Sequence, residues 1–168
     1  MKQLILGGAR SGKSRLAQQR VTETHLPVTY IATATVYDDE MAARVAKHKL
    51  ERPASWDILE VPEQLPEQLS QLSGQKKAVI VDCLTLWATN LLMHSEADLI
   101  SGIDELCNSV SLFQGELVMV SNEVGWGIVP MGEISRQFQD QTGLMHQRLA
   151  EIVDRVTLTV AGLPLEIK

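Results

Sequence analysis

The sequence has little of what secreted, membrane-embedded or nucleic-acid-binding proteins use. Its two cysteines, Cys83 and Cys107, are too few for a disulfide framework, which favours a reducing, cytoplasmic compartment. No apolar run approaches the roughly 18–20 residues of a membrane span, and no signal-peptide pattern is visible. The 168 residues carry a net charge of −6, so we expect no broad electrostatic attraction to nucleic acid or to an anionic membrane.

Internal repeats, low-complexity tracts and linkers are also missing, so we predict a single domain over residues 1–168. Strand-like and helix-like segments alternate along the chain. Inner segments such as Ala78–Asp82 are near-continuous apolar runs, typical of parallel strands covered on both faces. The alternation predicts a doubly wound α/β fold whose ligands gather at the carboxyl ends of the strands.

The boundaries of these segments follow from apolar patterning and turn residues. The expected strands are Lys2–Leu6, Val28–Ala32, Asp57–Val61, Ala78–Asp82, Leu117–Ser121 and Val156–Val160, with a short edge strand at Leu165–Lys168. The expected helices are Lys13–Glu23, Asp38–Glu51, Pro62–Leu72, Leu84–Met93, Ala97–Phe113 and Glu133–Asp154, the last broken near Gly143.

Residues 7–14 form the pattern G-x-x-x-x-G-K-[ST], the phosphate-binding loop of nucleoside-triphosphate enzymes. The loop lies between an expected strand and an expected helix, which is the setting that it requires. Its glycines let backbone N–H groups point at phosphate oxygens, and the following helix presents its positive end to the same anion. Lys13 would meet the β- and γ-phosphates, and the Ser14 hydroxyl would bind Mg²⁺.

Asp82 ends the most apolar of the expected strands. In a chain with a phosphate-binding loop, a carboxylate at this place is suited to organise Mg²⁺. The alternative is that Asp82 caps the helix that starts at Leu84, since aspartate is a favoured N-cap residue. Both roles can hold at once.

Three residues of the expected helix Asp38–Glu51 and its end, Arg44, His48 and Arg52, are spaced four apart and so share one face. A histidine among cations has a lowered pKa, and neutral imidazole is a nucleophile whose target phosphate the guanidiniums could hold. Composition alone favours the simpler interpretation of a basic, solvated helix face.

The segment Val120–Pro130 follows an expected strand and holds two glycines, an amide, a carboxylate and a tryptophan. It could close over a substrate or orient a phosphate-accepting hydroxyl at the ligand end of the sheet. It could equally be a structural loop in which Trp126 packs as a plug, and the residues alone leave both interpretations open.

Together these segments resemble the bifunctional adenosylcobinamide kinase/adenosylcobinamide-phosphate guanylyltransferase family of cobalamin biosynthesis. The resemblance runs from Leu4 to the C-terminus. It is carried by Gly7–Ser14, Tyr30–Ala34, Asp38–Val45, His48 with Arg52-Pro53 and Trp56, Asp82–Thr85 with Asn90-Leu91, and the loop from Asn122 to Pro130.

The resemblance implies a RecA-like P-loop domain, with a mostly parallel sheet flanked by helices on both faces, assembled as a homotrimer. It implies that ATP or GTP phosphorylates adenosylcobinamide and that GMP then passes from GTP, through a guanylylated His48, to give adenosylcobinamide-GDP and pyrophosphate. The implied nucleotide-binding residues are Gly7, Gly8, Ala9, Arg10, Ser11, Gly12, Lys13, Ser14, Ala32, Thr33, Ala34, Lys49, Leu50, Glu51, Arg52, Glu60 and Asp82. Catalysis would rest on His48 and Lys13, Mg²⁺ on Ser14 and Asp82, and weaker substrate or loop roles on Arg44, Asn122 and Glu123.

One departure from the family pattern is visible near the C-terminus. The pattern Gly-x-x-Asn-Gln is replaced by Gly143-Leu144-Met145-His146-Gln147, so that His146 stands in place of an amide. Three other interpretations of the chain remain: a guanylyltransferase without the kinase step, a generic small-molecule P-loop kinase, and a nucleotide-dependent switch or assembly module. A covalent nucleotide adduct on histidine would distinguish the guanylyl-transfer interpretations from the last two.

Overall fold

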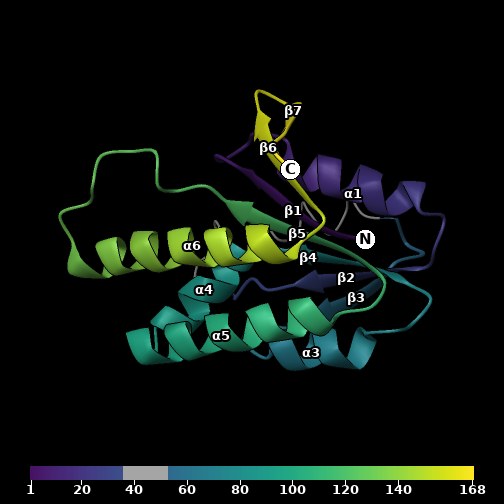
Figure 1. The fold of residues 1–168 in the computed structure, drawn as a ribbon, viewed down its shortest axis with the longest axis horizontal. Coiled ribbons are helices and arrows are strands. Elements are labelled where there is room, and N and C mark those ends of the chain that lie inside the picture. Colours follow the sequence, from purple (N-terminus) through teal and green to yellow (C-terminus); the bar gives the residue numbers. More distant parts are fainter. Residues whose placement is uncertain (36–52) are drawn as a thin grey trace.

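A seven-stranded sheet is the centre of the computed structural model, which describes residues 1–35 and 53–168 (Figure 1). The strand order is β3–β2–β4–β5–β1–β6–β7, and every neighbouring pair is parallel except β6 with β7. The strands are β1 Lys2–Gly7, β2 Val28–Ala32, β3 Asp57–Glu60, β4 Ala78–Asp82, β5 Glu116–Asn122, β6 Arg155–Val160 and β7 Leu163–Glu166.

Helices cover both faces of this sheet, as the apolar character of the inner strands predicts. The helices of the described residues are α1 Lys13–Glu23, α3 Leu65–Leu72, α4 Leu84–Leu92, α5 Glu96–Leu112 and α6 Glu133–Ile152. Side chains of α3, α4, α5 and α6 form one buried cluster with the sheet, while α1 packs on the opposite face (Figure 1). Among the described residues, we find no helix that combines the length and apolarity needed to cross a membrane.

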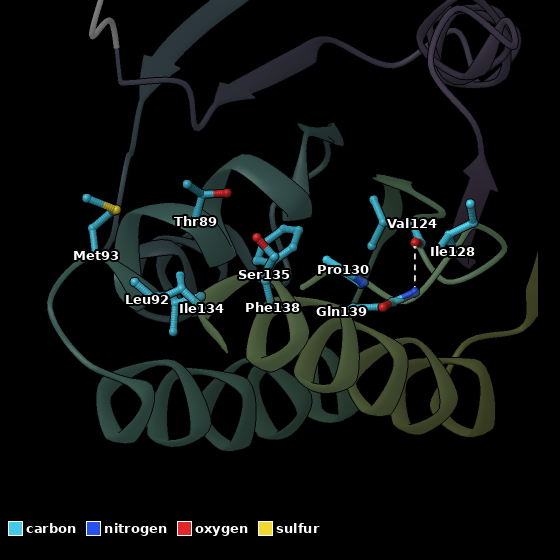
Figure 2. Close-up of a pocket in the computed structure, with 10 residues that line it drawn as sticks. All are labelled: Thr89, Leu92, Met93, Val124, Ile128, Pro130, Ile134, Ser135, Phe138 and Gln139. Atoms are coloured by element: carbon cyan, nitrogen blue, oxygen red, sulfur yellow. Dashed lines mark hydrogen bonds between the residues drawn. The ribbon is translucent and has the colours of Figure 1, made fainter. Parts of the chain in front are cut away.

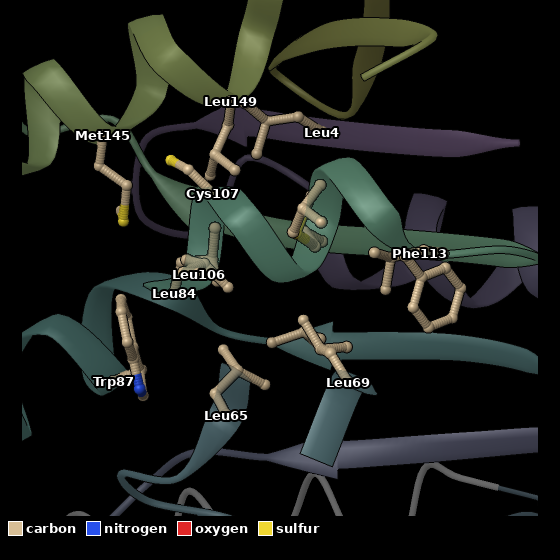
Figure 3. Packing of buried hydrophobic residues seen from close by; sticks show 14 of the residues in the cluster. Leu4, Leu65, Leu69, Leu84, Trp87, Leu106, Cys107, Phe113, Met145 and Leu149 are labelled. Carbon is tan, nitrogen blue, oxygen red and sulfur yellow. The ribbon is translucent and has the colours of Figure 1, made fainter. Parts of the chain in front are cut away.

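The larger cluster is built around Trp87 of α4, which is fully buried among leucines of α3 and α5 (Figure 3). Its indole Nε1 donates a hydrogen bond of 2.7 Å to the carbonyl of Glu63, so burial leaves no polar atom of the ring unsatisfied. A buried aromatic side chain of this kind typically contributes ~3–5 kcal/mol relative to alanine. This packing fixes α4, whose first residue follows the carboxyl end of β4 by two positions.

The predicted elements agree with the observed ones apart from boundaries and two corrections. The expected break near Gly143 is wrong: α6 is continuous, because Thr142, Met145 and Leu149 are buried along one face and outweigh the ~1 kcal/mol that glycine costs in a helix. The edge strand begins at Leu163 rather than Leu165, since Leu163 already pairs with Val160. The expected helix Asp38–Glu51 lies outside the described residues. For the described residues, the predicted α/β fold is confirmed.

The C-terminal hairpin β6–β7 is bound to the first third of the chain. Arg20 of α1 is buried and donates hydrogen bonds to Gln3 Oε1 at 2.8 Å and to Glu166 Oε1. Thr157 Oγ1 donates to Glu166 Oε2 at 2.9 Å. Because the Arg20 guanidinium is both ion-paired and hydrogen-bonded, these contacts offset the free-energy cost of removing its charge from water.

Candidate active site

The strand register brings the predicted site residues to one edge of the sheet. Glu60, Ala32 and Asp82 are aligned in neighbouring strands, with Ala32 opposite both others. Further along the same edge, Gly7 lies opposite Asn122 on one side and Thr159 on the other. All are at the carboxyl ends of parallel strands, where α/β proteins bind their ligands.

The phosphate loop connects β1 to α1 and depends on two of its glycines. Gly12 has φ +100°, a left-handed conformation, and a Cβ there would lie 3.2 Å from the Cα of Gly162. At Gly7, a Cβ would lie 2.6 Å from the carbonyl oxygen of Thr159, closer than any real contact. The loop therefore packs directly on β6 and on the turn that follows it.

Polar contacts fix the loop in the same place. Ser11 Oγ lies 2.7 Å from Thr159 Oγ1, which in turn donates to the Leu6 carbonyl at 3.1 Å. The backbone N–H of Gly162 donates to the Ser11 carbonyl at 2.9 Å. The turn of the β6–β7 hairpin is thus hydrogen-bonded to the middle of the phosphate loop.

Lys13 is buried at the start of α1, and its ammonium curls back over the loop. Nζ donates to the Gly8 carbonyl at 2.6 Å and to Ser11 Oγ at 3.5 Å, and these two contacts leave one of its three N–H donors for a ligand. Burial lowers the pKa of Lys13, while the nearby Cys83 and Asp82 groups act in the opposite direction. Lys13 is therefore electrostatically linked to the carboxylate at the end of β4.

Asp82 is held by Tyr30, whose phenol donates a hydrogen bond of 2.8 Å to Oδ2. The N-cap residue of α4 is Cys83, so the capping alternative for Asp82 is wrong. Burial raises the pKa of the Cys83 thiol to about 11, with Asp82 adding to the effect, so this thiol is protonated at neutral pH and unreactive.

The segment Ala32–Ala34 is tied to the start of α4. The Thr33 hydroxyl donates to the Cys83 carbonyl at 2.7 Å and accepts the Cys83 N–H at 2.9 Å. Asn90 Nδ2 donates to the Thr33 carbonyl at 2.9 Å. The Thr33 side chain is fully buried in this network, whereas Ala32 and Ala34 are half-buried.

The loop after β5 is joined to the phosphate loop. Glu123 N–H donates to the Gly7 carbonyl at 3.0 Å, and Asn122 N–H donates to Thr85 Oγ1 at 3.2 Å. Glu123 Oε1 accepts the Gly125 N–H at 2.7 Å. Trp126 is 75% exposed, so the alternative in which it packs as a plug is wrong.

Beyond this loop lies an apolar groove of about 320 Å³ between α4, α6 and the segment 124–130 (Figure 2). Gln139 of α6 donates a hydrogen bond of 3.2 Å to the Val124 carbonyl across it, drawn as a dashed line in Figure 2. The groove is lined by Thr89, Leu92, Met93, Val124, Ile128, Pro130, Ile134, Ser135, Phe138 and Gln139.

Sequence reasoning missed several residues that support this site, namely Tyr30, Thr85, Ser121 and Thr159. Thr159 could have been found, because it lies near the carboxyl end of a predicted strand. Of the predicted site residues, Arg44, His48, Lys49, Leu50, Glu51 and Arg52 lie outside the described residues.

The class of protein follows from the fold and the loop. A mostly parallel sheet with a glycine-rich loop between β1 and α1 is a P-loop nucleotide-binding domain. The family model described as cobinamide kinase / cobinamide phosphate guanyltransferase matches residues 3–167. The chain belongs to this family of enzymes.

Individual relatives agree with this assignment. The chain is 48% identical to the bifunctional adenosylcobalamin biosynthesis protein CobP of Pseudomonas aeruginosa, covering 100% of this chain and 98% of the relative. It is 38% identical to CobU of Salmonella typhimurium, with 98% of each chain covered. A solved structure from Pyrococcus horikoshii OT3 shares the fold with a TM-score of 0.54 at 12% identity, covering 99% of this chain and 85% of that one.

Proposed function

We propose that this enzyme phosphorylates the aminopropanol hydroxyl of adenosylcobinamide with ATP or GTP and then transfers GMP from GTP to the new phosphate. The observation that carries this proposal is the placement of Lys13 over the phosphate loop, at the sheet edge that also holds Asp82, Asn122 and Glu123. One edge thus offers a triphosphate site with acceptor-orienting groups beside it.

The triphosphate would bind to Gly7–Ser14, with the Lys13 ammonium on the β- and γ-phosphates. Further nucleotide contacts are proposed for Ala32–Ala34, Lys49–Arg52 and Glu60. Glu60 is exposed at the end of β3, in the row that contains Ala32 and Asp82, which supports its part in the proposal.

Magnesium fits the donor groups at this edge. The ion prefers oxygen ligands and keeps several waters, so one hydroxyl and one carboxylate are enough. Ser14 and Asp82 would supply them, and the Tyr30 hydrogen bond orients the Asp82 carboxylate while leaving Oδ1 for such a role. When bound, the ion would neutralise charge on the phosphates.

In the kinase step, the substrate hydroxyl oxygen bonds to the γ-phosphorus as the bond from that phosphorus to the nucleoside diphosphate breaks. Glu123 would accept a hydrogen bond from this hydroxyl and would take up its proton as the oxygen attacks. Although Glu123 Oε1 already accepts the Gly125 N–H, a carboxylate has further acceptor sites.

In the guanylyl step, a His48 ring nitrogen bonds to the α-phosphorus of GTP as pyrophosphate leaves. A phosphate oxygen of adenosylcobinamide phosphate then attacks the same phosphorus, and the P–N bond breaks to restore His48. Arg44 and Arg52 would neutralise charge on the α-phosphate.

Incubation with α-labelled GTP and Mg²⁺, followed by denaturation, tests this chemistry in the wild-type protein. Protein-bound label should be lost in acid and retained in alkali, because a P–N bond has that stability and a serine ester does not. Label from γ-labelled GTP should not remain, since it departs with pyrophosphate. An enzyme that phosphorylates adenosylcobinamide but takes up no α-label would be a small-molecule kinase; one that takes up label without phosphorylating would be a guanylyltransferase alone.

We also propose that the enzyme is a homotrimer, as the family resemblance implies. Apolar side chains such as Ile128 and Met131 are each 97% exposed, and association would bury surface of this kind. Light scattering at micromolar protein should give three times the chain mass of 18.6 kDa. A mass equal to that of one chain would contradict the trimer.

A further inference from the structure

A buried histidine that departs from the family pattern lies beneath the loop after β5. His146 of α6 is 6% exposed, and its Nε2 is 2.7 Å from the hydroxyl of Ser121, which is fully buried in β5. Its Nδ1 is 3.7 Å from Glu123 Oε2 and has no hydrogen-bond partner within the described residues. The ring therefore lies between a buried hydroxyl and the carboxylate beside the phosphate loop.

These distances select one tautomer of the His146 ring. If Nε2 carried the proton, the lone pair of Nδ1 would face the Glu123 carboxylate, which is repulsive. With the proton on Nδ1, Ser121 donates to Nε2, and the positive end of the N–H dipole lies at the ring nitrogen 3.7 Å from Glu123 Oε2, an electrostatic contact longer than a hydrogen bond. Burial lowers the pKa of His146 more than Glu123 raises it, so the ring is neutral at pH 7.

The order Ser121, His146 and Glu123 resembles that of a nucleophilic serine triad, although His146 and Glu123 are 3.7 Å apart and not hydrogen-bonded. Ser121 is 0% exposed, however, so no substrate reaches its hydroxyl. Because Ser121 cannot act as a nucleophile, the function left for these three residues is to orient the Glu123 carboxylate.

Helix α6 contacts the same loop at a second point. Gln139 donates to the Val124 carbonyl at 3.2 Å (Figure 2). Gln139 precedes His146 by seven residues, about two helical turns, so both project from one side of α6. Since Glu123 N–H is bonded to the Gly7 carbonyl, this side of α6 is connected through the loop to the phosphate-binding segment.

We propose that His146 is a positioning residue for phosphoryl transfer, one that holds Glu123 and the start of its loop at the acceptor side of the triphosphate. The inference rests on the proposed role of Glu123 in the kinase step. His146 would therefore affect the kinase step alone. The proposed guanylyl transfer through His48 does not use the Glu123 carboxylate.

The experiment compares both reactions in the wild type and in His146→Leu, which fills the space but makes no hydrogen bond. Because a misplaced acceptor group costs up to ~10²-fold, kcat for adenosylcobinamide phosphorylation should fall ~10–100-fold with little change in the KM for nucleotide. Guanylyl transfer to supplied adenosylcobinamide phosphate should stay within about twofold. His146→Asn, which installs the amide of the family pattern, should recover most of the lost kcat.

Two further variants make the result decisive. Gln139→Leu removes the hydrogen bond from α6 to the Val124 carbonyl without changing the buried cluster. Its selective loss of phosphorylation should be smaller, about 3–10-fold. This variant tests the inference if His146→Leu does not fold. His94→Ala removes an exposed histidine paired with Glu63 and should leave both reactions unchanged. Thermal unfolding of each variant separates positioning from loss of structure.

Phosphorylation at the wild-type rate in His146→Leu, or a parallel fall of both reactions in the folded variants, would overturn the inference while leaving the proposed function intact. A wild-type protein that phosphorylates no adenosylcobinamide would overturn the proposed function, and the inference with it.

Discussion

His48→Ala is expected to abolish both guanylyl transfer and the acid-labile adduct formed from α-labelled GTP. The variant lacks the nitrogen that we propose bonds to the α-phosphorus, so the exchange would no longer be divided into two displacements. Phosphorylation of adenosylcobinamide should be largely preserved, since direct transfer of the γ-phosphate needs no histidine nucleophile. Both reactions and the retained label should be measured on the same preparation.

The matched controls are His25→Ala and His94→Ala, which each remove another histidine with an accessible ring. Both should form the adduct as the wild type does. Acid-labile label that persists in His48→Ala would show that a different histidine is guanylylated. His146 is a poor candidate for that role, since it is buried and its Nε2 is bonded to Ser121.

Lys13→Ala is expected to lower turnover in the kinase reaction by ~10²–10³-fold, the usual loss when one charge-stabilising contact is removed. The buried ammonium is the cation that we propose for the β- and γ-phosphates, and it lies against the phosphate loop. Guanylyl transfer should fall as well if one loop holds the triphosphate in both reactions. Steady-state rates with each substrate give the comparison.

Arg15→Ala is a suitable control, because Arg15 is exposed on the same helix and, among the residues that the structure describes, its guanidinium donates to the Gly162 carbonyl at 3.5 Å. Its turnover should stay close to that of the wild type. Full guanylyl transfer by Lys13→Ala would contradict the single-loop arrangement and would show that GTP binds elsewhere for that reaction.

The fold was largely predictable because its signals are local. Strand β4 is a continuous apolar run that ends in Asp82, and both of its predicted boundaries are confirmed. The phosphate-loop motif likewise predicts a strand before it and a helix after it. Gly143 misled the prediction because glycine disfavours helices, whereas the burial of Met145 and Leu149 against the sheet, a tertiary effect, decides the outcome.

The candidate site was predictable only as a set of strand ends. Glu60, Ala32 and Asp82 follow separate strands, and the parallel sheet aligns them. The supporting contacts were not predictable, because they join distant parts of the chain. Nothing in the sequence pairs Ser11 with Thr159 or His146 with Ser121, since such pairs depend on which strands and helices become neighbours.

The contact between Gly162 and Ser11 has a consequence for the order in which the protein matures. Domains form while the chain is synthesised from its N-terminus, and the phosphate loop leaves the ribosome well before the β6–β7 hairpin. The hairpin turn that holds it is about 150 residues behind, as the hydrogen bond from Gly162 N–H to the Ser11 carbonyl shows. A nascent chain therefore carries the complete phosphate-binding motif before the hairpin turn that packs on it exists, and we expect nucleotide binding by the loop to follow synthesis of that turn.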